Sequence, residues 1–291
     1  MALRERLRVL AELVQLEHTI FGLPFAGCAL AFAARRGPVP VWRIAVAVSC
    51  FTLARAAAMA WNRYVDRDLD AANPRTAQRP VPRGAVPARV ALLVALTCAA
   101  GFLATAVLLG PLPLLLAPVA LVILLGYSHL KRVTWGCHFG LGVALAGAPL
   151  GAGIAARATV DAEVAWLALA VGTWVAGFDL IYACLDERFD RENGVHSVPA
   201  RFGRRVALGL SAALHVVSVV ALALAGLDAG GGALYGASVV AAAVLLAIEH
   251  ALVRPSDLSR VGAAFFTVNG VLAVLFFVGT LLDTVAKGVG T

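Results

Sequence analysis

The sequence predicts an all-α membrane protein in which nine transmembrane helices form a bundle. Three observations lead to this fold class. Hydrophobic residues make up 61% of the 291 residues, whereas charged residues make up only 14%. Apolar runs recur that are long enough for a helix to cross a bilayer, which takes about 20 residues. The two-residue alternation that is typical of membrane β-barrels does not occur in these runs.

Charged segments or Gly/Pro breaks separate the nine expected spans. The segment Gly110 to Pro113 ends the third span, and the segment Gly226 to Gly232 ends the seventh. We expect one membrane domain over residues 1–291, with pseudo-repeat halves of about 1–130 and 131–291. The expected spans cover residues 13–34, 41–61, 86–109, 113–129, 136–155, 163–184, 204–226, 232–253 and 261–282.

The distribution of Lys and Arg predicts the orientation. Most of these residues fall in cytoplasmic segments if the N-terminus is cytoplasmic, as the positive-inside rule requires. The pair Arg35-Arg36 is an exception, since it falls in an outer segment. The net charge of +7 therefore fits a protein of the bacterial plasma membrane. Basic and aromatic residues do not interleave on a polar surface, so we expect no nucleic-acid partner. No protein partner is evident.

An acidic cluster ends the second span. Asn62, Asp66 and Asp70 are four residues apart, which places them on one face of a helix. Carboxylates on one face repel each other unless a cation lies between them. Mg²⁺ binds one or two carboxylates together with substrate phosphates, so it is the cation that this pattern favours.

A second acidic cluster ends the sixth span. Tyr182, Asp186 and Asp190 repeat the four-residue spacing, and Asp179 lies one turn before Tyr182. The predicted topology puts both clusters on the cytoplasmic side, each followed by a basic loop. We therefore expect the two clusters to face each other around one polyanion. Asp179 lies deeper in its span, where a carboxylate is costly and by default functional.

These motifs resemble those of the UbiA superfamily of intramembrane prenyltransferases. The run from Asn62 to Asp70, with Arg75 and Arg79 after it, is similar to the first aspartate-rich motif of the family, and the run from Asp179 to Asp190 is similar to the second. A shorter third motif is matched by Tyr127, Lys131 and Arg132. The resemblance covers nearly the whole chain, and it implies a central chamber within the bundle.

The resemblance also indicates a subgroup. The stretch from Glu17 to Phe25 is similar to that of 4-hydroxybenzoate polyprenyltransferases and of menaquinone-pathway relatives that prenylate a dihydroxynaphthoate. Arg63 departs from the family, because many members carry Asp at this position. A composition rich in Ala, Arg, Gly and Val is typical of a GC-rich bacterial genome and favours the menaquinone pathway.

The activity that the resemblance implies is transfer of a polyprenyl group from an allylic diphosphate to an aromatic acceptor in the membrane lipid. Two Mg²⁺ ions and basic side chains would neutralise the diphosphate as the C–O bond breaks. The implied metal ligands are Asn62, Asp66, Asp70, Asp186 and Asp190. The implied contacts to the diphosphate come from Lys131, Arg132, Arg75 and Arg79.

Four further residues have expected roles beside these. Tyr182 would orient an aspartate or the diphosphate, and Asp179 would bind substrate or pair with a loop Arg. Arg55 and Arg63 are candidates for binding a carboxylate on the acceptor. The residues expected to carry catalysis are Asp66, Asp70, Asp186, Asp190, Tyr182 and Lys131.

Three alternatives remain open from the sequence. A membrane terpene cyclase, or a transferase to a haem, chlorin or glycerol-phosphate acceptor, would share the same metal–diphosphate face. An ion-coupled transporter would instead need carboxylates deep in the bilayer, within matched broken helices. In the blandest interpretation, the acidic residues belong to solvated loops.

Overall fold

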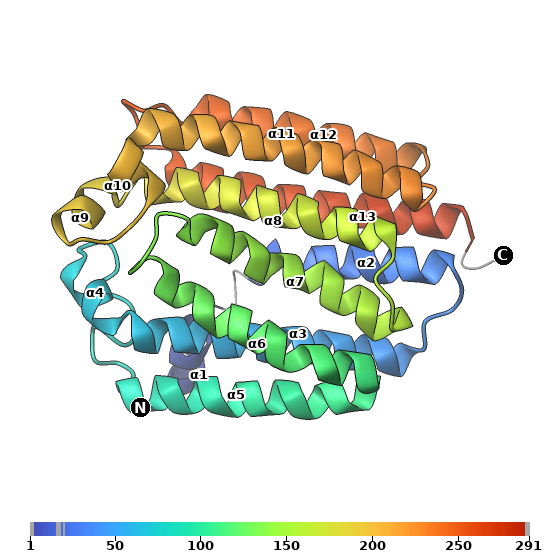
Figure 1. Ribbon diagram of the computed structural model, residues 1–291, viewed down its shortest axis with the longest axis horizontal. Coiled ribbons are helices and arrows are strands. Elements are labelled where there is room, and N and C mark those ends of the chain that lie inside the picture. The colour runs from blue at the N-terminus through green and yellow to red at the C-terminus, as the bar shows by residue number, and fades with distance from the viewer. Residues whose placement is uncertain (1–2, 16–18, 20, 289–291) are drawn as a thin grey trace.

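The structure is a computed structural model that describes residues 3–15, 19 and 21–288. It is an all-α bundle of long helices that lie side by side (Figure 1). Eight helical segments in the described part of the chain are long and apolar enough to cross a membrane. These segments are α3 (Val41–Val65), α5 (Ala88–Leu109), α6 (Pro111–Leu130), α7 (Cys137–Arg157), α8 (Ala162–Ala183), α11 (Arg204–Asp228), α12 (Ala233–Leu252) and Ala263–Ala286. The last combines the π-helical turn η2 (Ala263–Val268) with α13 (Asn269–Ala286).

The first expected span, 13–34, is wrong in its bounds. The chain forms α1 (Leu3–Leu13) and then the shorter apolar helix α2 (Leu23–Arg35). Pro24 explains the start of α2, because proline lacks the N–H that a helix interior needs but fits the first turn. Glu17 and His18, which belong to the subgroup stretch, lie outside the described residues.

The helix α8 lies at the centre of the bundle. Its side chains Leu167, Val171, Trp174 and Val175 are fully or almost fully buried. Hydrophobicity cannot drive helices together in lipid, so close packing between small residues carries more of the association. The backbones of α7 and α8 meet in this way, since a Cβ at Gly142 would lie 2.3 Å from the carbonyl oxygen of Gly172.

Three short helices gather at one end of the bundle, which we call the site end (Figure 1). The helix α4 (Arg67–Ala72) follows α3, and α9 (Glu187–Glu192) follows α8. The helix α10 (Val198–Phe202) then leads into α11. Asp66 and Asp186 each stand at the start of a short helix, so both acidic motifs reach the same end.

Arginine–carboxylate pairs tie the helices together at the opposite end. Arg35 Nη2 lies 2.9 Å from Asp283 Oδ2, and Arg36 Nη2 lies 2.8 Å from Glu163 Oε2. Both carboxylates are buried. The Arg35-Arg36 pair that breaks the charge rule therefore has internal partners, so its positive charge is compensated within the protein.

Candidate active site

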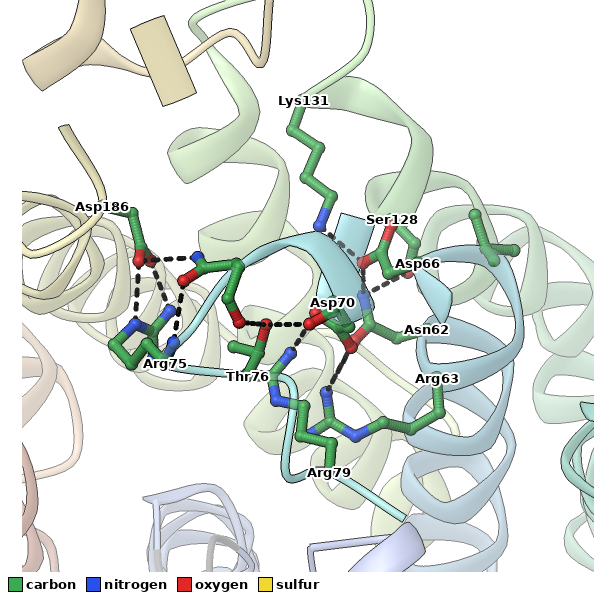
Figure 2. A network of polar contacts seen from close by, with 12 residues as sticks. Asn62, Arg63, Asp66, Asp70, Arg75, Thr76, Arg79, Ser128, Lys131 and Asp186 are labelled. Carbon is green, nitrogen blue, oxygen red and sulfur yellow. Dashed lines mark hydrogen bonds and ion pairs between the residues drawn. The ribbon is translucent and has the colours of Figure 1, made fainter. Parts of the chain in front are cut away.

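A cavity of about 240 Å³ opens between the two acidic motifs at the site end. The loop after α4 passes beneath it, and Lys131 reaches in from the end of α6 (Figure 2). The predicted site residues that line this cavity are Asn62, Asp66, Asp70, Arg75, Arg79, Lys131, Asp179, Tyr182, Asp186 and Asp190. Segments 120 residues apart in the sequence thus contribute to one cavity.

Asp66 is surrounded by donors but is not saturated by them. Its Oδ2 accepts hydrogen bonds from Lys131 Nζ at 2.6 Å and from Asn62 Nδ2 at 2.7 Å. Its Oδ1 lies 2.9 Å from Arg132 Nη1 but accepts no hydrogen bond among the described residues. The carboxylate is 1% exposed. A buried oxygen without a hydrogen bond is costly, so this atom is a strong candidate to bind a cation.

Asp70 has the same pattern. Its Oδ1 accepts a hydrogen bond from Arg79 Nη1 at 2.7 Å, whereas its buried Oδ2 accepts none in the described structure. Arg63 Nη1 lies 3.7 Å from this Oδ2. Thr76 holds the backbone of this turn, because its hydroxyl donates to the carbonyl oxygen of Asp70 at 2.9 Å. Two unsatisfied carboxylate oxygens therefore belong to the first motif.

Two residues that follow the first acidic cluster bind Asp186. Arg75 forms a bidentate pair with it, in which Nε donates to Oδ1 at 2.9 Å and Nη2 pairs with Oδ2. Asn73 Nδ2 also donates to Oδ1 at 2.9 Å. Arg75 further donates to the Tyr182 hydroxyl at 2.7 Å and stacks over its ring. Figure 2 shows the contact between Arg75 and Asp186, which joins the two motifs.

Asp190 is buried and has a neutral partner. The Ser197 hydroxyl donates to its Oδ2 at 2.7 Å. Burial raises the pKa of Asp190 to about 6; the Ser197 hydrogen bond lowers it and the charge of Asp186 raises it. Asp190 therefore gains or loses its charge near neutral pH.

Asp179 also lines the cavity, one turn below Tyr182 on α8. Its Oδ2 lies 2.7 Å from His138 Nδ1, on α7. The imidazole of His138 is 3% exposed, whereas the carboxylate of Asp179 is 26% exposed. The expected loop Arg is thus replaced by a buried histidine as the partner of Asp179.

Three predicted substrate-binding residues do not line the cavity. Arg55 instead donates to the Thr19 hydroxyl at 3.2 Å and to the Gln15 carbonyl oxygen at 3.1 Å. Arg63 is 2% exposed and lies behind Asp70 and Asn62. Arg132 donates to the backbone carbonyl oxygens of Val65 and Ser128 while it faces Asp66. Arg63 and Arg132 are therefore placed to support the first motif.

Further residues of the cavity were not singled out from the sequence. Asn73 and Ser197 follow the first and the second acidic cluster within a few residues, so their position in the sequence was an available signal. His138 forms no metal-ligand spacing, and only the fold brings it to Asp179. The cavity lining also includes Leu69, Thr76, Cys137, Ala183, Phe189, Val195 and His196.

The donor set fits Mg²⁺ that is shared with a phosphate ligand. No group of three or more His, Cys, Asp or Glu side chains that could hold a metal ion occurs in the described part of the chain. The unsatisfied oxygens of Asp66 and Asp70 instead supply one carboxylate each. Mg²⁺ commonly binds one or two carboxylates and takes its other ligands from water and substrate phosphate. The two-ion expectation stays a prediction.

Comparisons with known proteins agree with the geometry. The model of the UbiA prenyltransferase family matches residues 22–278. The 4-hydroxybenzoate octaprenyltransferase of Alkalilimnicola ehrlichii is 35% identical over 233 residues, which cover 79% of this chain and 78% of the relative. The protein of the same name from Shewanella piezotolerans is 29% identical over 278 residues, which cover 95% of this chain and 96% of the relative.

Solved structures show the same fold. The apo structure of a UbiA homologue from Aeropyrum pernix K1 matches with a TM-score of 0.83 and 35% identity, over 92% of this chain and 98% of the homologue. A UbiA homologue from Archaeoglobus fulgidus bound to GPP and Mg²⁺ matches with a TM-score of 0.75 over 95% of this chain and 99% of the homologue. Because the two sequences are only 19% identical, this match shows similarity of fold and nothing further.

Proposed function

The chain is an enzyme that belongs to the UbiA prenyltransferase family, and from this premise we propose that it transfers a polyprenyl group from an allylic diphosphate to an aromatic acceptor of the 4-hydroxybenzoate or dihydroxynaphthoate type. The reaction would serve quinone biosynthesis. The observation that carries the proposal is the single cavity in which unsatisfied carboxylate oxygens lie beside Lys and Arg. The names of the relatives support the aromatic acceptor.

Bound Mg²⁺ would neutralise the leaving diphosphate, with Asn62, Asp66, Asp70, Asp186 and Asp190 as its protein ligands. In the structure described here, Lys131 and Arg79 neutralise Asp66 and Asp70. With metal bound, Asp66 and Asp70 would bind the metal in place of Lys131 and Arg79. These two basic side chains would then bind phosphate oxygens. Arg75 would act likewise from Asp186, since a guanidinium binds phosphate in bidentate fashion.

Aromatic side chains continue from the cavity into the bundle. The ring of Tyr182 stacks on Phe265 at 4.3 Å, Phe265 contacts Phe178 at 5.1 Å, and Phe178 contacts Trp174 at 5.0 Å between ring centroids. Aromatic faces stabilise cations, and their apolar surface excludes water. This wall would protect the allylic cation until a ring carbon of the acceptor attacks it.

We also propose that the site end faces the cytoplasm of a bacterial plasma membrane, with the N-terminus on the same side. The excess of Lys and Arg in the segments at this end supports that orientation. The proposed partners are the prenyl diphosphate, the aromatic acceptor and membrane lipid.

An acceptor screen tests the function. Purified protein in detergent would receive Mg²⁺, a prenyl diphosphate and, in turn, 4-hydroxybenzoate or a dihydroxynaphthoate, and product masses would be measured. We expect one acceptor to gain the mass of one prenyl group. Diphosphate release that yields only a hydrocarbon or alcohol would indicate a terpene cyclase instead. Transfer to a haem, chlorin or glycerol-phosphate acceptor alone would replace the aromatic assignment. Ion flux in liposomes without diphosphate would favour a transporter.

A further inference from the structure

We propose that His138 is a positioning residue that holds Asp179 in place to accept the hydrogen bond and the proton of the hydroxyl group on the aromatic acceptor. The inference rests on the proposed function and deepens it, because it assigns the subsite that recognises the phenol.

The hydrogen bonds around His138 define its tautomer. The backbone N–H of Val198 donates to His138 Nε2 at 3.3 Å, so Nε2 carries a lone pair. The proton of a neutral imidazole is then on Nδ1, which donates to Asp179 Oδ2 at 2.7 Å. The ring thus fixes the orientation of the carboxylate through this hydrogen bond.

The surroundings of Asp179 distinguish it from the other carboxylates of the cavity. Asp66, Asp70 and Asp186 are each paired with Lys or Arg. Asp190 is only 8% exposed, and its Oδ2 already accepts from a hydroxyl. Asp179 has no Lys or Arg partner in the described structure, and its Oδ1 has no hydrogen bond there. It is therefore the carboxylate that is free to accept a proton from a neutral ligand.

The order of groups along α8 matches the order of groups in the reaction. Asp179 and Tyr182 are three residues apart and lie on one face. Asp179 is about 4.5 Å deeper along the helix axis, at 1.5 Å per residue. A diphosphate bound at Asp186 would extend its allylic carbon past the Tyr182 ring, so an acceptor that attacks this carbon would place its hydroxyl near Asp179.

The proton transfers balance in this arrangement. The phenolic O–H bond breaks and its proton moves to Asp179 Oδ1 while the ring carbon bonds to the allylic carbon. The allylic C–O bond breaks, and its electron pair leaves with the diphosphate. The ring carbon then loses its hydrogen as a proton to the released diphosphate, and Asp179 returns its proton to the oxygen. The carboxylate is regenerated, and the ring is again aromatic.

The alternative role for His138 is to anchor the segment before α10. Two other bonds hold this segment to the α6–α7 connection, because His196 N donates to the Lys131 carbonyl oxygen at 2.8 Å and Cys137 Sγ lies 3.4 Å from the His196 carbonyl oxygen. Two substitutions separate the roles. The amide of His138→Asn occupies the place of Nδ1 and can still donate to Asp179. The longer His138→Gln places its amide near Nε2 and can only keep the bond to Val198.

The test is steady-state kinetics of wild type, His138→Asn and His138→Gln, with KM measured separately for 4-hydroxybenzoate and the prenyl diphosphate. We expect His138→Gln to lose about tenfold in kcat/KM for the acceptor, the cost of one charge-assisted hydrogen bond. We expect His138→Asn to stay within about threefold of wild type. The KM for the diphosphate and the melting temperature should be unchanged in both variants.

A binding measurement tests the same inference without depending on turnover. Wild type should bind 4-hydroxybenzoate more tightly than its methyl ether, because the ether has no proton to donate, and the ratio of the two inhibition constants should fall toward one in Asp179→Asn and His138→Gln. Normal kinetics of His138→Gln, a loss in both His138 variants or a raised KM for the diphosphate would each overturn the inference while the proposed function stands. Absence of prenyl transfer by wild type would overturn both.

Discussion

The two ends of the bundle use the same residue types with different results. At the end opposite the cavity, Asp283 uses both oxygens: Oδ2 pairs with Arg35 at 2.9 Å and accepts from Gly232 N, and Oδ1 accepts from Tyr235 N. At the site end, Asp66 and Asp70 each keep one buried oxygen without a hydrogen bond in the described structure. The comparison teaches that the presence of charge does not separate the two kinds of site. A carboxylate whose two oxygens are both hydrogen-bonded stabilises the fold, whereas one that keeps an oxygen without a hydrogen bond can bind a ligand.

The largest expected effect is on activity at the site end. Asp66→Ala and, separately, Asp186→Ala should each lower kcat/KM about a thousandfold, because loss of a metal ligand removes several kcal/mol of transition-state stabilisation. Product formation measured by mass, with the melting temperature as a folding control, checks this. Activity above a few per cent of wild type in both variants would contradict the role assigned to the site end.

The corresponding change at the opposite end should affect stability. Asp283→Ala leaves Arg35, whose side chain is 10% exposed, without its anionic partner. Breaking a buried ion pair typically costs 3–5 kcal/mol, so we expect a loss of about 3 kcal/mol in the free energy of unfolding. Denaturant unfolding in detergent measures it. The folded variant should keep normal kcat/KM, and a selective loss of activity would make this ion pair part of the site.

A smaller effect should follow pH at the site end. The raised pKa of Asp190, about 6, means that the carboxylate is protonated below this pH and loses its charge for Mg²⁺. The apparent affinity for Mg²⁺ should therefore fall about tenfold from pH 7 to pH 5. Titration of activity with Mg²⁺ at each pH measures it. The Asp190→Asn variant cannot titrate here, so a fall that persists in this variant would assign the effect to another group.

The smallest effect is expected for an exposed pair at the site end. Arg188 Nε lies 2.8 Å from Glu192 Oε1 on α9, and both side chains are exposed. Exposed pairs contribute little to stability because water and salt screen them, so Arg188→Ala should leave both the melting temperature and kcat/KM within experimental error of wild type. A larger change in either quantity would show that α9 does more than expose this pair.

Local patterns predicted much of this architecture. The break at Gly110–Pro113 and the acidic faces that begin at Asn62 and Tyr182 depend on residues near one another in sequence, so spacing alone locates them. The bounds predicted for the first span were wrong because hydrophobicity alone makes residues 13–34 one continuous run, whereas Pro24 favours the start of a new helix. The partner of Asp179 could not be predicted, because His138 meets it only where α7 crosses α8. The stacking of Phe265 on Tyr182 likewise depends on the π-helical turn η2.

The contact between Gly142 and Gly172 also limits how far the distance between His138 and Asp179 can change. Gly142 lies one turn from His138 on α7, and Gly172 lies two turns from Asp179 on α8, so the separation of these backbones also sets the 2.7 Å distance within the His138–Asp179 pair. A methyl group on Gly142 would collide with the Gly172 carbonyl and push the helices apart. A hydrogen bond weakens once its heavy atoms separate beyond about 3.2 Å, which leaves about half an ångström of play. Gly142 and Gly172, which lie in transmembrane helices, therefore fix the helix separation that keeps His138 and Asp179 within hydrogen-bond distance.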